Sequence, residues 1–135
     1  MTLQEIILNK LHAVKRNELI ASQLKEASEI LERNNKIIVS WELATLLIDD
    51  LIPTQSDEDY QNPSSIADAE LLLRAKTGLV NLNDIRLDSF RPIAVEKFNL
   101  NIIDGNHRHY AIKHIGEHHI YSLLCEVKIN QSTTI

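Results

Sequence analysis

The amino-acid sequence predicts an α/β (α+β) domain, in which a small mixed sheet with packed helices is preceded by a helical extension. Three patterns predict it: apolar residues at helical spacing in the first quarter, later short runs rich in Ile, Val and Leu, and a strand–turn–helix pattern after residue 100. We divide the chain into an N-terminal helical extension, residues 1–35, and a sheet domain, residues 36–135. Its 135 residues suit one domain with an appended segment.

The extension is expected to be helical over residues 2–34. Thr2 and Glu5 have the spacing of a capping box, and the polar segment 15–17 is expected to divide the stretch into two helices. Residues 34–35 end the pattern. Its apolar stripe consists of Leu3, Ile6, Ile7, Leu11, Val14, Leu19, Ile20, Leu24, Ala27 and Leu31. Two interpretations stay open: the stripe packs on the sheet domain, or it docks a protein partner or a second copy of the chain.

Residues 36–52 are ambiguous, because 37–39 and 45–48 favour strands whereas Ser40 could cap a short helix over 40–44. Residues 53–65 then form a polar, acidic loop that is long for a compact domain. Loops of this kind are often functional, although a plain surface loop is the commoner case.

A helix is expected over residues 66–76, with Ser65 as its cap and Thr77-Gly78 as its end. Its buried side would consist of Leu71, Leu72, Ala75 and Leu79. Residues 82–90 form a turn-rich bridge, Pro92 opens the next strand, and residues 120–127 form the last one.

Residues 100–116 carry most of the functional signal. The apolar run 100–103 reads as a strand, Asp104-Gly105 as a tight turn, and the following segment as a helix that ends near Gly116. A helix that begins at such a turn directs free backbone N–H groups beyond the strand end. These donors and the helix dipole favour an anion, typically a phosphate.

The side chains of this helix refine the prediction. Arg108 shares a face with Ala111, Ile112 and Ile115 at about 100° per residue, so its guanidinium needs a carboxylate or a bound anion. His107 borders that face, whereas His109 and Lys113 are expected to point to solvent. The alternative is structural: Arg108 pairs with Asp104 or another acid and only fastens helix to strand.

The composition of the chain limits the classes of protein to which it can belong. The chain has a net charge of −5, 44% hydrophobic residues and one cysteine, Cys125, which lies in a predicted strand. One cysteine forms no internal disulfide and fits a reducing compartment. We find no apolar stretch of membrane-spanning length and no signal-peptide pattern, so a cytoplasmic location is expected. The six histidines lack the spacing of a metal site, and no metal ligands are predicted.

The segment Asp104-Gly105-Asn106-His107-Arg108, followed by a helix, resembles the signature of the ParB/sulfiredoxin-like superfamily, to which the label ParB-like nuclease domain is often attached. The free-serine kinase variant, Asp-Gly-His-His-Arg, is the most similar. The flanking segments 51–55, 91–95 and 120–127 also resemble the family's proline boxes and final strand, and the resemblance covers residues 43–129. It implies the superfamily's sheet and a strand that ends near Ile48.

The resemblance also implies a site. Gly105, His107 and Arg108 match the family's phosphate-binding turn, which Asp104 and Asn106 complete, and the implied cofactors are ATP, ADP or CTP with Mg²⁺. Asn106 stands where sulfiredoxins carry their catalytic cysteine, which argues against sulfiredoxin activity. Where serine kinases carry a likely base, this chain has Gln55, which takes no proton. Candidate catalytic residues are therefore His107 and the nearby acids Asp57 and Glu58.

Three functions follow from the resemblance. The first is binding of a nucleotide or another phosphorylated small molecule, with activity as a nucleotide-dependent phosphotransferase or nucleotide hydrolase. The second is a ParB-like nuclease or DNA-binding protein, which the acidic net charge disfavours. ParB proteins also carry a downstream helix-turn-helix domain, and we expect none here because Ile135 follows the last predicted strand closely. The third is a non-enzymatic protein-interaction module.

Overall fold

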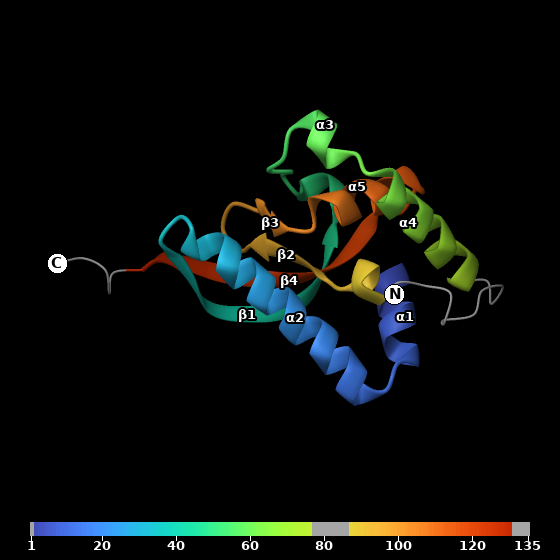
Figure 1. The fold of residues 1–135 in the computed structure, drawn as a ribbon, viewed down its shortest axis with the longest axis horizontal. Coiled ribbons are helices and arrows are strands. Elements are labelled where there is room, and N and C mark those ends of the chain that lie inside the picture. The colour runs from blue at the N-terminus through green and yellow to red at the C-terminus, as the bar shows by residue number, and fades with distance from the viewer. Residues whose placement is uncertain (1, 77–86, 131–135) are drawn as a thin grey trace.

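The structure is a computed structural model that describes residues 2–76 and 87–130 (Figure 1). Within them lies a mixed sheet of four strands in the order β1–β4–β2–β3. The strands are β1 (Lys36–Leu47), β2 (Ile93–Glu96), β3 (Ile102–Asp104) and β4 (His119–Ile129). The central strand β4 runs antiparallel to β1 and parallel to β2, and β3 is antiparallel to β2. The predicted mixed α+β fold is confirmed.

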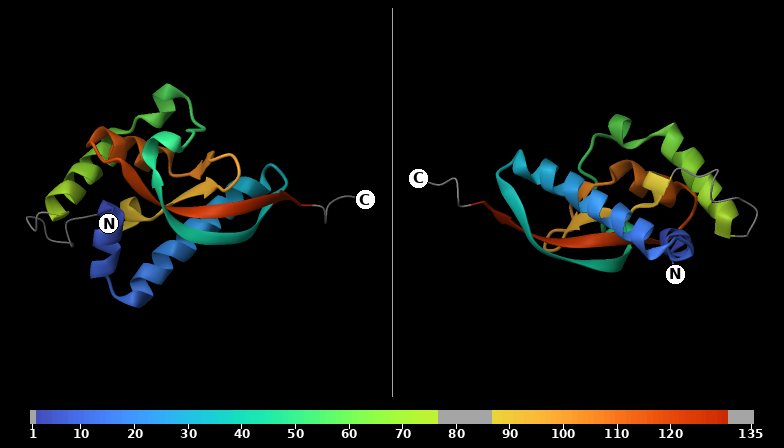
Figure 2. Two further views of the ribbon diagram at one scale, coloured as in Figure 1. Left: turned by 180° about the vertical axis from the view of Figure 1, so that it is seen from behind. Right: turned by 60° about the horizontal axis from the view of Figure 1, so that its bottom comes forward.

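Apolar clusters cover both faces of the sheet. On one face, α2 (Ala13–Glu32) crosses the strands, as Figures 1 and 2 show, and its buried Ala27 and Leu31 pack against Leu123 and Cys125 of β4. The other face packs against α5 (Asn106–His114) and the short helix η1 (Ile48–Asp50). The residues of this second cluster are Ile48, Leu51, Ile93, Val95, Ile102, Ile112 and Ile120.

The N-terminal extension forms α1 (Leu3–Lys10) and α2, and it shares the core of the sheet domain. The capping box of Thr2 and Glu5 is confirmed. The break lies at Leu11 and His12, and the prediction of a break at residues 15–17 was wrong. The reason is that the His12 side chain accepts a hydrogen bond from the backbone N–H of Val14 and so caps α2. Lysine and arginine, which follow, are good helix formers.

Residues 36–47 form one long strand, so the alternative of a helix over residues 40–44 was wrong. A β-bulge between Ile38 and Ser40 interrupts its register with β4, and η1 follows directly. The predicted strand end near Ile48 agrees with this.

The predicted loop 53–65 contains the short helix α3 (Asp57–Tyr60) and the start of α4 (Pro63–Lys76). The prediction that Ser65 caps the latter was wrong: the Asn62 side chain accepts hydrogen bonds from the backbone N–H groups of Ser64 and Ser65 at 2.9 and 3.3 Å. Pro63 suits the first helical position, where its missing N–H costs nothing.

The predicted elements after residue 90 are confirmed, with small changes at their ends. After η3 (Leu87–Phe90) and Pro92, strand β2 leads to β3, the turn at Gly105, α5 and β4. The predicted ends of the preceding helix at Thr77-Gly78, its Leu79, and most of the bridge 82–90 lie outside the described residues.

Candidate functional site

The turn between β3 and α5 requires a glycine. Gly105 has a φ of +108°, in the left-handed region, and a Cβ atom there would come within 2.4 Å of the Ile93 side chain. As in every helix, the first backbone N–H groups of α5 have no acceptor within the helix, and here no side chain caps them.

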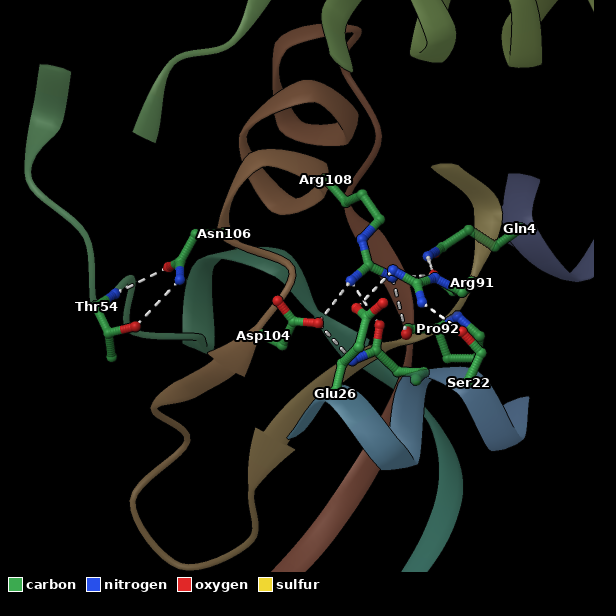
Figure 3. Close-up of polar contacts among 10 residues, drawn as sticks. Gln4, Ser22, Glu26, Thr54, Arg91, Pro92, Asp104, Asn106 and Arg108 are labelled. Carbon is green, nitrogen blue, oxygen red and sulfur yellow. Dashed lines mark hydrogen bonds and ion pairs between the residues drawn. The ribbon is translucent and has the colours of Figure 1, made fainter. Parts of the chain in front are cut away.

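Arg108 lies inside the protein and donates hydrogen bonds to protein acceptors (Figure 3). One terminal nitrogen donates to the backbone carbonyls of Arg91 and Pro92 at 2.9 and 3.1 Å, and the other donates to the side-chain oxygen of Gln23 at 2.6 Å. The second nitrogen also lies 3.5 Å from the Asp104 carboxylate. The Asp104 contact of the structural alternative is present, and the guanidinium connects α5 to α2, to β3 and to the segment before β2.

Gln23 is a residue of the site that sequence reasoning missed. Its side chain is fully buried, donates to the Asp104 carboxylate at 2.8 Å and accepts from Arg108. A signal was present, because a glutamine stands in line with Leu19 and Ala27 on the buried stripe of α2. Burial by itself raises the pKa of Asp104, but the charge of Arg108 and the hydrogen bond from Gln23 outweigh it and leave that pKa below its usual value.

Arg91 is the second buried cation of the site. Its guanidinium donates to the Ser22 hydroxyl at 2.7 Å and to the Glu26 carboxylate at 2.9 Å, both on α2 (Figure 3). The Gln4 side chain of α1 donates to the Arg91 backbone carbonyl at 3.2 Å. The N-terminal helices therefore complete the wall of the site, which the sequence did not indicate.

Asn106 holds the segment after Pro53 against the turn. Its side-chain oxygen accepts from the backbone N–H of Thr54 at 2.9 Å, and its nitrogen donates to the Thr54 hydroxyl at 3.1 Å. That hydroxyl donates to the backbone carbonyl of Ile102 at 2.8 Å. Asn106 itself is buried, so its side chain has a structural role here.

The two histidines of α5 lie in different surroundings. His107 is half-buried, and its Nε2 donates to the backbone carbonyl of Asp59. His109 was expected in solvent, but this was wrong: it is 2% exposed, because η1 and α3 cover that side of α5. Its Nε2 donates to the Ile48 carbonyl at 2.9 Å, so Nδ1 accepts from the Tyr60 hydroxyl. Lys113 is exposed, as predicted.

Burial also shifts the pKa values of Tyr60 and His109, whose hydrogen bond joins α3 to α5. It lowers the pKa of His109 below its ordinary value, despite the hydrogen bond to Ile48. It raises the pKa of Tyr60 to about 12, with a smaller contribution from Tyr110. Both groups are thus neutral near pH 7, and the hydrogen bond between them needs no buried charge.

Of the two acidic candidates, only the side chain of Glu58 is described, and it is exposed on α3 and does not reach the cleft at the turn. The side chain of Asp57 lies outside the described part of the chain. The backbone of Asp59 nevertheless contacts His107, so the acidic segment does lie next to the turn.

A cleft of about 1050 Å³ opens at the start of α5. The turn, α2, the start of α4 and the segment after Pro53 line it. Hydroxyl and amide side chains are frequent in its wall: Thr54, Gln55, Asn62, Ser64, Ser65 and Ser89. Among the described residues, its charged lining consists of Lys15, Arg33, Arg91 and Arg108 against Asp68 and Asp104, with His107 as a further basic group. The lining thus has four cationic side chains and two carboxylates, and Arg91, Lys15 and Arg108 also form ion pairs with Glu26, Glu18 and Asp104.

In the described ranges, 2–76 and 87–130, His, Cys, Asp and Glu side chains nowhere gather in a group of three or more that suits a metal ion. No helix in these ranges is long and apolar enough to span a membrane.

No protein-family model matches this chain, and no curated protein or solved structure does so either. The resemblance to the ParB/sulfiredoxin-like superfamily thus stays a prediction from the motif and its flanks.

Proposed function

We propose that this protein binds a nucleotide or another phosphorylated small molecule in the cleft at the start of α5. The observation that carries the proposal is the uncapped N-terminus of α5, which lines a polar cleft with an excess of cationic side chains. Backbone N–H groups at a helix start and nearby positive charge both favour phosphate oxygens. The cleft volume of about 1050 Å³ is sufficient for a ligand of that size.

In this proposal the backbone of residues 106–108 contacts the phosphate, and Arg108 contributes charge and positions the helix. Its terminal nitrogens already donate to Gln23 and to two backbone carbonyls, and they lie next to Asp104. The Ser64 and Ser65 hydroxyls at the start of α4 are suitable donors for further phosphate or sugar oxygens. The hydroxyls of Thr54 and Ser89 already donate to the Ile102 carbonyl and the Asp68 carboxylate.

We extend the proposal to a cytoplasmic phosphotransferase or nucleotide hydrolase that uses ATP, ADP or CTP with Mg²⁺. The reaction would require a base, and the acidic candidates are Asp57 and Glu58 on α3. Glu58 does not line the cleft in this structure, so binding is better supported than catalysis.

Thermal denaturation with ATP, ADP and CTP tests the proposal, since a ligand that binds the folded state raises the melting temperature. We expect a rise for the wild type and none for His107→Asp. An added carboxylate in the first turn of α5 stabilises the helix through its dipole, but it repels a bound phosphate. The matched control is His118→Asp, the same substitution at an exposed position outside the cleft, which is expected to keep the response. The absence of a shift with all three nucleotides, or an equal shift in His107→Asp, contradicts the proposal.

A further inference from the structure

A second surface, remote from the cleft, lies along the edge strand β1. This strand borders the sheet and pairs with β4 on one side only, among the strands of the described chain (Figure 1). Half of the large apolar side chains that are exposed in the described part belong to it: Ile37, Val39, Trp41, Leu43 and Leu47. Contiguous exposed apolar residues on a protein surface commonly mark an interaction site.

The two halves of β1 differ in how well they are protected against pairing with a further strand. Natural proteins protect edge strands with lysines, prolines, charges and bulges. The first half has Lys36 and the bulge between Ile38 and Ser40. The second half, residues 41–47, is regular and contains one charged side chain, Glu42, which points toward Lys97 at 3.9 Å. Apart from Glu42, this half has none of these protections, and its side chains are mostly apolar.

The apolar side chains of this half lie on one face. Trp41 and Leu43 are paired with Cys125 and Leu123 of β4, which α2 covers, so they lie on the α2 side of the sheet. They extend past the helix and remain 46% and 39% exposed, and Leu47, two pairs further on the same face, is 49% exposed. Alternate side chains of a strand lie on the same face, so all three of these residues could contact side chains of one further strand added at this edge.

We propose that residues 41–47 of β1 pair antiparallel with the same residues of a second copy, which joins two sheets into one across a two-fold axis at Ala44. Residues that lie opposite each other in a sheet have their side chains on the same face, so in this pairing odd-numbered residues lie opposite odd-numbered ones and even opposite even. The two-fold axis therefore passes beside a residue and not between two residues. At Ala44 the pairing places Trp41 next to Leu47 of the partner and Leu43 next to Thr45 of the partner, and it leaves the bulge outside.

Charge selects this register and this partner. An axis at Glu42 would set two carboxylates opposite each other, which is destabilising, and an axis at Leu43 would bring the bulge at Val39 into the ladder. An axis at Ala44 separates the two Glu42 carboxylates by four residues, about 14 Å along the strands, which is more than a Debye length. Behind this edge, Glu5 accepts from Thr45 and Arg16 lies beside Leu43, so the two nearby charges are of opposite sign. A second copy presents the same apolar side chains and the same balanced pair of charges, whereas a strongly charged peptide would find no net opposite charge there.

Sedimentation velocity across the micromolar range tests the proposal on the full chain. We expect a dimer for the wild type and a monomer for Trp41→Glu with an unchanged far-UV circular dichroism spectrum, because Trp41 is 46% exposed at the edge of the sheet. The matched control is Phe98→Glu, at an aromatic side chain that is 79% exposed between β2 and β3, and it should stay dimeric. A monomeric wild type, or a dimer that Trp41→Glu leaves intact, overturns the proposal.

Disulfide formation tests the register. Ala44→Cys should form a covalent dimer under mild oxidation, since the two residues face each other across the axis within the range of a disulfide. Glu42→Cys is the control, and it should stay monomeric on a non-reducing gel because its two copies lie about 14 Å apart. The native Cys125 is buried and does not interfere. Equal cross-linking of both variants, or none in Ala44→Cys, overturns the proposed pairing.

Discussion

Gln23 offers the sharpest test of how the site is held together. Replacing it by leucine keeps most of its volume but removes the donor to Asp104 and the acceptor for Arg108, at 2.8 and 2.6 Å. The side chain is fully buried, so water cannot replace either bond without rearrangement.

The expected loss of stability can be worked from these contacts. A hydrogen bond to a charged group contributes about 1.5–3 kcal/mol, and two of them set an upper limit near 6 kcal/mol. Arg108 and Asp104 already lie 3.5 Å apart and can approach each other, which recovers part of that loss. We therefore expect Gln23→Leu to lower the free energy of unfolding by about 3 kcal/mol.

Urea titration followed by circular dichroism measures this value directly. For a chain of 135 residues, about 3 kcal/mol corresponds to a fall in melting temperature of roughly 10 °C. Lys25→Leu is the control, since Lys25 is exposed on the same helix and its replacement should change stability by at most about 0.5 kcal/mol. A Gln23→Leu variant as stable as this control would refute the view that Gln23 joins α2 to the turn.

Three further predictions concern glycines, a histidine and the cysteine. Gly105→Ala should cost more than about 3 kcal/mol because its Cβ would meet Ile93, whereas Gly116→Ala, with open space around it, should cost only about 1 kcal/mol of backbone strain; urea titration compares them. Stability should fall as the pH drops below about 6.5, because burial lowers the pKa of His109 and the unfolded chain binds the proton more readily; His109→Gln should flatten this dependence between pH 7 and 5. The Cys125 thiol, whose pKa burial raises to about 11, should react with a thiol reagent at pH 8 only after denaturant is added, and prompt reaction in the native state would contradict its burial.

Local signals in the sequence were sufficient for most elements of the fold. The capping box at Thr2, the proline before β2 and the glycine before α5 each act within one turn of the chain, so their effects are readable without a structure. The capping of α2 by His12 and of α4 by Asn62 escaped prediction, because several nearby residues were equally suitable caps. In both helices, the residue that caps the N-terminus is the one whose side chain reaches the free backbone N–H groups, and the sequence does not show which residue does so.

The site was less predictable than the fold because its partners come from distant segments. Gln23 and Arg108 are 85 positions apart, and Tyr60 and His109 are 49 apart, so no local pattern connects them. His109 illustrates the consequence: its helical position predicts exposure, yet η1 and α3 bury it. Helical periodicity identifies one packed face, whereas α5 packs on more than one side.

Arg108 shows how one residue can support two interpretations until its acceptors are known. As a ligand, a guanidinium needs unoccupied donors directed at the anion, but here backbone carbonyls, Gln23 and Asp104 surround it. As a fixed charge, it still raises the potential at the start of α5, because a partly buried charge acts over several ångströms at low effective dielectric. An anion there would depend on backbone N–H groups, which side-chain truncation does not remove. A variant that adds a charge beside those groups, such as His107→Asp, therefore tests the site more directly than loss of Arg108, which would weaken the fold and the site together.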